Sequence, residues 1–585
     1  MKKNLAVLAS PLVALGGVAA YWLGNRWCGP FAAARRYGRS GNVDWRFAMP
    51  AGEWLWVLFA ALVTLAAFGL LFLLRDRQTA APQPRRLVWL LPVVAAALLA
   101  GAIRLFVLQS QPIVDDEAAY RFEARTLAAG RLTAPPPPNR KAFDYIFLGS
   151  YRGHWFSQYS YGHPAILAAA EHLGSMGLTG PLFTALIVLL IFLLARRLFD
   201  EDTARYAAFF AACSPLLLST GATLLSQNTA TALTLLGIYL ALVAADSGRF
   251  VHVFLTSLVF GAALWIRQYE PGIMGLGPLA YLVATWWRRP NRLALIGAAA
   301  LGAALTLGPL LLLQWKLWGH PFWTNYQAYW WGYLGVQVAS PFSFGAAIET
   351  RHTPWLGLRF TLYNLVRLDW FLLGLPGGLA LAIYGARLRR DSIARLAVLS
   401  GVVLNFAVLF FYFWPGLSDT GPLLHHTSGA VLIVFLAAGW RRLTARFRLP
   451  SWAWLCLPLL AATTFWPSQL GALYRAALAG GELPRLAREM ELKNAVVFAA
   501  KLPWIGHERC SVYGLPLPEP DLSDEVLFLQ TQGVPVDVDL AAKAFPGREI
   551  YFLRQIDGRV ALLPLVDYTG EESLRQAARD RDLPD

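Results

Sequence analysis

Long apolar runs are the feature of this chain that most constrains its fold. About thirteen stretches reach or approach 20 mostly apolar residues, the length that a helix needs to cross a bilayer. They lie near residues 4–24, 52–74, 87–108, 180–195, 203–222, 226–245, 250–266, 270–287, 293–314, 366–385, 394–413, 423–440 and 451–470. Because 56% of the 585 residues are hydrophobic and only 15% are charged, the composition excludes an ordinary soluble protein. The sequence therefore predicts an all-α polytopic membrane protein with about thirteen transmembrane helices.

Positive residues predict how these helices are oriented. Lysine and arginine gather in short clusters between apolar runs, and such clusters stay on the cytoplasmic side of a membrane. The clusters lie at 2–3, 75–86, 196–197, 288–292, 387–395 and 441–448. All of them fall on one side if the amino terminus is inside and the spans alternate. The net charge of +15 therefore indicates topology rather than nucleic-acid binding.

The amino-terminal region fits this scheme least well. Segment 25–51, which the alternation puts outside, carries five arginines against the charge rule. Residues 1–24 could be a membrane anchor or a cleaved signal peptide, because a charged start, an apolar middle and small residues at the end are typical of a signal. We favour an anchor, since the next span would otherwise have to reorient without help.

Three long segments are expected on the outer face. Two are external loops, 109–179 and 315–365, and the third is the tail after 471. In the tail, "NAVVFAA", "DEVLFLQTQ" and "REIYFLRQI" are typical of short strands separated by turn residues. The predicted parts are residues 1–86 with two transmembrane helices, 87–470 as the main membrane domain, and 471–585 as a small soluble α/β domain.

The four cysteines have no spacing that indicates a metal site. Cys213 and Cys456 lie within apolar runs, as packing residues do. Cys28 and Cys510 could both face the outside, where a disulfide between them is conceivable.

Three consecutive acids, Asp115, Asp116 and Glu117, follow an apolar run at the predicted outer surface. Ionisable groups at membrane depth are costly, and by default they indicate a functional site. A structural alternative is that the acids begin a helix, because Asp is a favoured N-cap and acids suit a first turn. Glu117 could also pair with Arg121 one turn later. That alternative leaves the second Asp unexplained, so we expect at least one acid to be functional.

A carboxylate at the outer interface could act as a general base for an acceptor hydroxyl. A reactant arriving from lipid would carry the leaving group, and a leaving phosphate needs positive charge. Arg267, in the short loop "LWIRQYEP" between two apolar runs, is the best-placed cation. The outer-face alternatives are His320, Arg351, His352, Arg359, Arg367, His425 and His426.

Several segments of the sequence resemble the motifs of a known family. "DDEAAYRFEARTLAAGRL" resembles the Asp-Glu motif in the first external loop of the GT-C superfamily of integral membrane glycosyltransferases, which includes protein O-mannosyltransferases and the lipid A aminoarabinose transferase. "QYSYGHPAILA" is similar to the family's "YPPGHPxLLA", with Ser160 and Tyr161 where prolines commonly stand. "LWIRQYEP" resembles a short "RP" turn. "SDTGPLLHHTSGAVLI" resembles "GPRYLLPxLP", although Leu423 and His425 replace the Arg and Tyr. The resemblance spans roughly 87–440.

The resemblance implies a GT-C-like fold and an inverting transfer of a sugar from a polyprenyl phosphate to an acceptor hydroxyl on the outer face. Asp116 would be the base and Glu117 would support it, with Asp115 additional to the usual pair. The expected substrate-binding residues are Tyr120, Arg267, Tyr159, His163, His320 and His425. No cofactor is required, although Asp115 and Asp116 could hold a divalent cation. The acceptor would be a lipid, glycan or protein, and the membrane a bacterial inner (plasma) membrane.

Two other classes of protein remain as alternatives. A polytopic transporter or flippase of lipid-linked or small-molecule substrates would have internal repeats and matching broken helices. No convincing repeat is present, and the acids lie in a loop rather than midway along a span. A membrane scaffold whose tail binds a partner would not need the acids.

Overall fold

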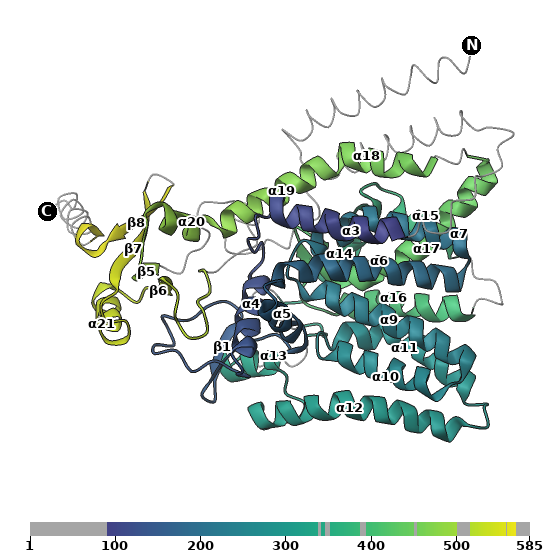
Figure 1. Cartoon of the computed structure of the whole chain (residues 1–585), viewed down its shortest axis with the longest axis horizontal. Helices are drawn as coiled ribbons and strands as arrows, with labels where there is room; N and C mark the ends of the chain where they lie inside the picture. Colours follow the sequence, from purple (N-terminus) through teal and green to yellow (C-terminus); the bar gives the residue numbers. More distant parts are fainter. Residues whose placement is uncertain are drawn as a thin grey trace, which may run out of the picture.

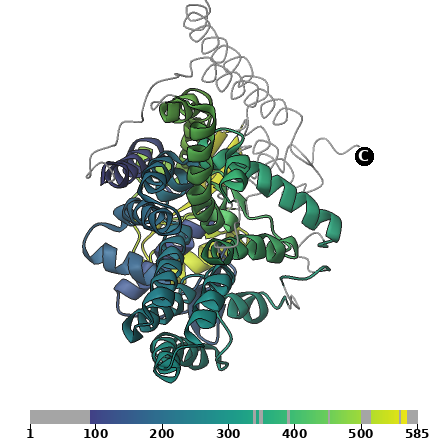
Figure 2. The same ribbon diagram turned by 90° about the vertical axis from the view of Figure 1, so that its right-hand side faces the viewer.

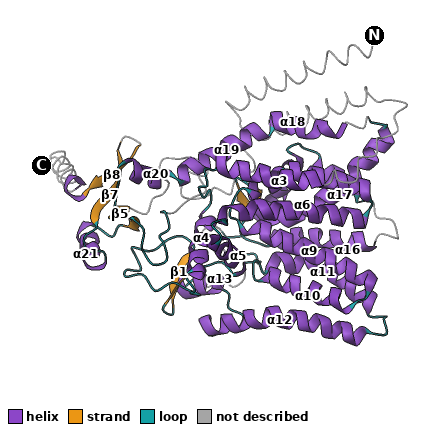
Figure 3. Ribbon diagram, viewed as in Figure 1, coloured by secondary structure: helices purple, strands orange, loops and turns teal. Residues whose placement is uncertain are grey.

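The computed structural model of the chain describes residues 90–336, 341–345, 351–386, 393–449, 453–499, 515–556 and 559–568. The first two predicted spans, segment 25–51, Cys28 and Cys510 lie outside the described residues. A body of roughly parallel helices forms most of the structure, and a small sheet lies beyond one end of it (Figures 1 and 3). Figure 2 views the same helices from the end opposite the sheet.

The helical body is formed by segments from most of the chain. Its first half comprises α3 (Leu90–Ala102), the π-helix η1 (Ile103–Val107), α6 (Thr179–Leu198), α7 (Glu201–Cys213), α8 (Pro215–Gly221), α9 (Ser226–Ser247), α10 (Phe250–Leu264), α11 (Tyr269–Trp286) and α12 (Arg292–Trp318). Its second half comprises α14 (Pro354–Leu373), α15 (Gly378–Gly385), α16 (Ile393–Phe410), η4 (Leu423–His425), α17 (His426–Phe447), η5 (Ala453–Leu455), α18 (Cys456–Thr464) and α19 (Trp466–Gly480). Cys213 and Cys456 are partly buried free thiols in this body.

Six helices of the described residues are long and apolar enough to cross a membrane, or seven if α14 and α15, bent by 86°, form one span. The predicted count of thirteen is therefore not confirmed. One expected span, 203–222, divides into α7 and α8 because Ser214 is extended before Pro215, as the residue before a proline prefers. Another, 366–385, covers the end of α14, which stops at Gly374 in the left-handed region.

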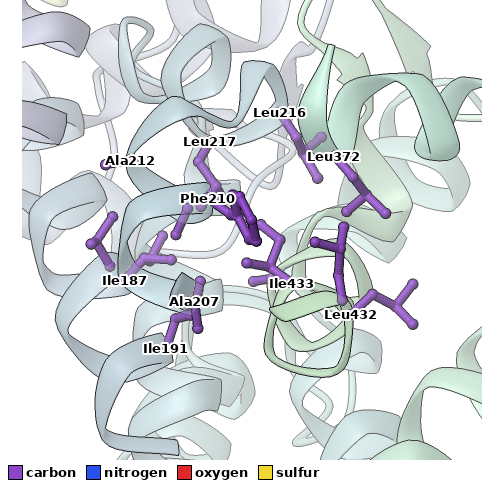
Figure 4. Packing of buried hydrophobic residues seen from close by; sticks show 14 of the residues in the cluster. Ile187, Ile191, Ala207, Phe210, Ala212, Leu216, Leu217, Leu372, Leu432 and Ile433 are labelled. Carbon is purple, nitrogen blue, oxygen red and sulfur yellow. The ribbon is translucent and has the colours of Figure 1, made fainter. Parts of the chain in front are cut away.

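The core of the helical body lies where α6, α7, α8, α14 and α17 meet (Figure 4). Ile187 and Ile191 of α6 pack there with Phe210 of α7 and Ile433 of α17. Helix α17 is buried at every residue from His426 to Trp440, although its last two turns are not. Enclosure over this length gives the segment attached to its amino-terminal end a fixed position.

The connections at one end of the body form a second, polar layer. They comprise α4 (Asp115–Ala128), β1 (Leu148–Tyr151), β2 (His154–Ser157), α5 (Gly162–His172), η2 (Met176–Leu178), α13 (Asn325–Gln327), the π-helix η3 (Ala328–Tyr333), β3 (Leu417–Ser418) and β4 (Gly421–Pro422). Strands β1 and β2 form an antiparallel hairpin, as do β3 and β4. Of these segments, α4, α5, β1 and α13 lie close together in Figure 1.

The tail forms a four-stranded sheet in the order β6-β5-β7-β8. Its elements are α20 (Glu482–Glu489), β5 (Ala495–Ala499), β6 (Val526–Gln530), α21 (Val534–Ala544), β7 (Glu549–Ile556) and β8 (Arg559–Pro564). The three segments predicted as strands are β5, β6 and β7. Strand β5 pairs in parallel with β6 and β7, whereas β8 is antiparallel to β7.

The sheet shares one hydrophobic core with the loop formed by residues 109–179. Phe143 and Trp155 of the loop belong to the same buried cluster as Val497 and Leu529 of the sheet. The Tyr145 hydroxyl donates to the Phe528 carbonyl at 2.6 Å. The tail is therefore packed against the loop that carries the predicted site.

Candidate functional site

The three acids occupy the first turn of α4, where negative charge is favoured by the helix dipole. Val114 is the N-cap and is extended, but its side chain accepts no hydrogen bond. Glu117 reaches back past the first turn, where its Oε1 accepts the N–H of Ile113, the residue before the N-cap, at 3.0 Å. The acids therefore lie in the first turn, as the structural alternative predicted, but its N-cap Asp is wrong, because Val114 occupies that position. The question is which carboxylates remain available for chemistry.

Glu117 is committed to backbone donors. Its second oxygen, Oε2, accepts the Leu224 N–H at 2.8 Å from the turn between α8 and α9. The side chain is buried, with 1% of the residue exposed. Burial raises the pKa of Glu117, against the two backbone donors and the positive charge of Arg104, which lower it. Glu117 therefore fixes α4 against the helical body.

Asp116 has different surroundings. It is half-buried, and the Tyr159 hydroxyl forms a hydrogen bond with its carboxylate. Burial raises the pKa of Asp116, while this hydroxyl and the positive charge of Arg267 oppose the rise. Asp116 is thus a carboxylate within the electrostatic reach of a cation, which is an arrangement that a proton acceptor can use.

Tyrosine and histidine side chains support the Asp116 side of α4. The rings of Tyr120 and Tyr159 are 4.5 Å apart, and those of Tyr120 and His163 are 4.9 Å apart. The Tyr120 hydroxyl lies 2.8 Å from Ser226 Oγ. The sequence-predicted residues Tyr120, Tyr159 and His163 are therefore brought together around Asp116.

His163 is a buried packing residue within this group. Its Nε2 lies 2.7 Å from the Leu224 carbonyl, to which it must donate, and its Nδ1 lies 2.9 Å from Thr229 Oγ1. Burial lowers the pKa of His163 to about 4. The imidazole is therefore neutral near pH 7, and both of its nitrogens have protein partners.

Arg267 lies in the short connection between α10 and α11, as the sequence predicted. Its Nη1 donates to Ser226 Oγ at 3.3 Å, and its Nη2 donates to the Tyr269 hydroxyl at 3.4 Å. Its Nε lies 3.1 Å from Glu270 Oε2, and 14% of the Arg267 side chain remains exposed. Ser226 thus joins Arg267 to Tyr120, so the arginine and Asp116 belong to one polar cluster.

Several members of this cluster were not predicted. The hydroxyls of Tyr326, in α13, and Tyr412, after α16, form a hydrogen bond, and Tyr412 lies within the electrostatic reach of Arg267 and Asp116. Tyr326 falls in the aromatic run that stood out in the sequence. Tyr412 and Ser226 carry no comparable signal, because only the fold brings their segments together.

Two predicted substrate-binding residues lie apart from the cluster. His320 is exposed, and its ring lies near Phe322. His425 is buried and stacks on Phe406 with 4.1 Å between ring centroids. Within the residues that the structure describes, no contact joins either histidine to Asp116 or Arg267.

Asp115 is directed to a separate space. With Glu117 and Arg104, it lines a cavity of about 850 Å³ between α4 and the tail, and Asp116 is not part of that lining. In the described residues, no group of three or more His, Cys, Asp or Glu side chains is arranged to hold a metal ion. Cation binding by Asp115 and Asp116 therefore stays a prediction.

Comparisons with known proteins agree with this architecture. Residues 170–313 match the family model of dolichyl-phosphate-mannose-protein mannosyltransferases. The comparison with curated proteins finds no significant match.

Two solved structures of ArnT from Cupriavidus metallidurans are similar to the chain. The one bound to undecaprenyl phosphate covers 81% of this chain and 94% of its own, with 13% identity and a TM-score of 0.52. The one in the apo state covers 82% and 90%, with 14% identity and a TM-score of 0.47. Archaeal oligosaccharyltransferase AglB from Archaeoglobus fulgidus covers 80% and 69%, with 14% identity and a TM-score of 0.39. Residues 170–313 are thus similar to the mannosyltransferase family, and the fold of the chain is similar to that of ArnT, as in GT-C membrane glycosyltransferases.

Proposed function

We propose that this protein transfers a sugar from a polyprenyl phosphate to an acceptor hydroxyl, with Asp116 as the general base. The observation that carries the proposal is the half-buried Asp116 carboxylate beside the Arg267 guanidinium. One group can accept a proton and the other can stabilise a leaving phosphate. The family match supports glycosyl transfer, and the undecaprenyl phosphate in the ArnT structure is consistent with a lipid-linked donor.

The reaction balances as a single displacement. The acceptor oxygen attacks the anomeric carbon of the sugar and forms the new glycosidic bond, while its proton passes to the Asp116 carboxylate. The bond between that carbon and the phosphate oxygen breaks, and polyprenyl phosphate leaves with the electron pair. Arg267 offsets the negative charge that develops on this phosphate. Attack from the face opposite the leaving group inverts the anomeric carbon.

The distribution of arginines supports a site on the outer face of the membrane. Arg197, Arg289 and Arg442 donate to the Leu242, Ala245 and Gly385 carbonyls at the helix ends remote from α4 (Figure 1). Basic residues at helix ends favour the cytoplasmic side. The opposite end, with Asp116, would then face the periplasm or the exterior, where lipid, glycan or protein acceptors are available.

The experiment compares Asp116→Asn with Asp115→Asn in a strain that lacks the native gene. Lipid-linked sugars and surface glycans are measured by mass spectrometry, and protein levels are checked in the membrane fraction. We expect the Asp116→Asn strain to lose one glycan residue and to accumulate its lipid-linked donor, whereas Asp115→Asn restores the glycan. Normal glycan in the Asp116→Asn strain would overturn the proposal. A flippase would instead change the distribution of the donor across the membrane.

A further inference from the structure

We propose that Glu270 is a positioning residue that holds the Arg267 guanidinium ready for the phosphate of the lipid-linked donor. The inference rests on the proposed function, because it assigns Arg267 to that phosphate. It concerns a carboxylate that the mechanism itself does not use. Glu270 lies in the first turn of α11 and its side chain has no exposed surface.

Glu270 connects Arg267 to the centre of the helical body. Its Oε2 lies 3.1 Å from Arg267 Nε, and its Oε1 accepts the Thr427 N–H at 3.2 Å. Thr427 belongs to the first turn of α17, within the part of that helix that is wholly buried. The carboxylate therefore ties a short connecting loop to a rigid element.

The contacts of Arg267 leave its outer nitrogens available. Nε, the nitrogen nearest the side-chain stem, faces Glu270, whereas Nη1 and Nη2 meet only the hydroxyls of Ser226 and Tyr269 in the described part of the chain. These two hydrogen bonds, at 3.3 and 3.4 Å, are long for N–H donors. A guanidinium has more N–H donors than these partners use, so a phosphate can be bound by the Nη edge while Glu270 holds the Nε edge.

The contact between Glu270 and Arg267 depends on charge. Among the residues that the structure describes, neither Nε nor Oε2 has an aligned hydrogen-bond partner, so the two atoms form an ion pair without good hydrogen-bond geometry. A buried ion pair that loses one partner leaves an uncompensated charge, which allows the remaining side chain to move. Because Glu270 is fully buried, its influence on a bound donor must pass through Arg267.

The test measures binding of undecaprenyl phosphate to the purified full-length protein in lipid nanodiscs. We expect Arg267→Ala to weaken binding by roughly 30-fold or more and Glu270→Gln by about 3- to 10-fold, because Gln keeps the shape but removes the charge. The double variant should bind as weakly as Arg267→Ala alone, since a residue that acts through Arg267 has no effect once Arg267 is gone. Glu270→Asp, which keeps the charge, should recover part of the affinity.

A matched control is Asp369→Asn. Asp369 accepts the Gly377 and Leu379 N–H groups at the bend between α14 and α15, away from α4, so the variant should bind as the native protein does. Native affinity in Arg267→Ala would contradict the proposed function. Weak binding in Arg267→Ala, with Glu270→Gln causing an equal further loss in that background, would overturn the role of Glu270 alone. If Glu270→Gln does not fold, Glu270→Ala, which also removes the charge, takes its place in the same comparison.

Discussion

Two adjacent carboxylates in the first turn of α4 differ in burial and in hydrogen-bond partners. On one side, Glu117 is enclosed and accepts two backbone N–H groups, from Ile113 and Leu224. On the other, Asp116 is half-buried and meets a tyrosine hydroxyl and the charge of Arg267. The comparison teaches that acidity and sequence position do not decide which acid can react. Under the proposed function, the acid that reacts is the one whose carboxylate meets Tyr159 and the charge of Arg267, not the one that holds two backbone N–H groups.

Asp116→Asn removes the proposed proton acceptor and has the largest expected effect. Replacing the proton acceptor should lower the transfer rate by roughly 10²–10⁴-fold. The melting temperature should stay close to that of the native protein, because Asn retains the shape and can still accept from Tyr159. Single-turnover transfer and thermal unfolding measure the two quantities. A folded Glu117→Gln variant with an equal loss of rate would remove the distinction between the two acids.

Glu117→Ala should weaken the attachment of α4 to the helical body. The substitution leaves the Ile113 and Leu224 N–H groups buried without their acceptor, which should lower the free energy of unfolding by roughly 2–4 kcal/mol. Thermal unfolding in detergent micelles would measure the loss, with Asp115→Ala as the neighbouring control that should lose less. If the Glu117→Ala protein melts at the native temperature, Glu117 does not anchor α4.

Glu123, two turns along α4, is a third acid of this helix, and its contribution to stability depends on pH. It is fully buried, its Oε2 accepts the Ser157 N–H at 2.9 Å, and burial raises its pKa from 4.5 to about 8. The folded state therefore keeps a proton that the unfolded state releases, so stability is present at low pH and is lost as pH rises from 4.5 to about 8. The loss should approach about 1.4 kcal/mol per pH unit.

The Glu123 effect is measured by melting the native protein and Glu123→Gln between about pH 5 and pH 8. The native melting temperature should fall more steeply, because Gln has no proton to release and can still accept from Ser157. Parallel curves for the two proteins would mean that Glu123 ionises in the folded state at ordinary pH.

Tyr145→Phe addresses the contact between the loop and the tail, and has the smallest expected effect. The change removes the buried 2.6 Å hydrogen bond to the Phe528 carbonyl, which should cost about 1 kcal/mol of stability or slightly more. The transfer rate should stay native, because Tyr145 belongs to the shared core rather than to the Asp116 cluster. A large loss of rate without a loss of stability would mean that the tail takes part in the reaction.

The sequence predicts which segments form the candidate site better than it predicts the role of each side chain. Apolar runs locate most of the helices, and the acids with Arg267 identify the end of the helical body at which the candidate site lies. A helix turns by roughly 100° per residue, so Asp116 and Glu117 face different neighbours that only the fold defines. Tyr412 and Ser226 are far from α4 in sequence for the same reason. His320 and His425 were expected in the site because they lie near predicted outer ends, yet nearness to a helix end does not specify the direction of a side chain.

The pH dependence of transfer tests most directly whether Asp116 is the proton acceptor. Only the ionised carboxylate can take the proton, so the rate of the native enzyme should fall as pH is lowered through a pKa above that of an ordinary aspartate. The residual activity of Asp116→Asn should lack this acid limb. An acid limb at the same pH in Asp116→Asn would assign the proton to another group and contradict the account.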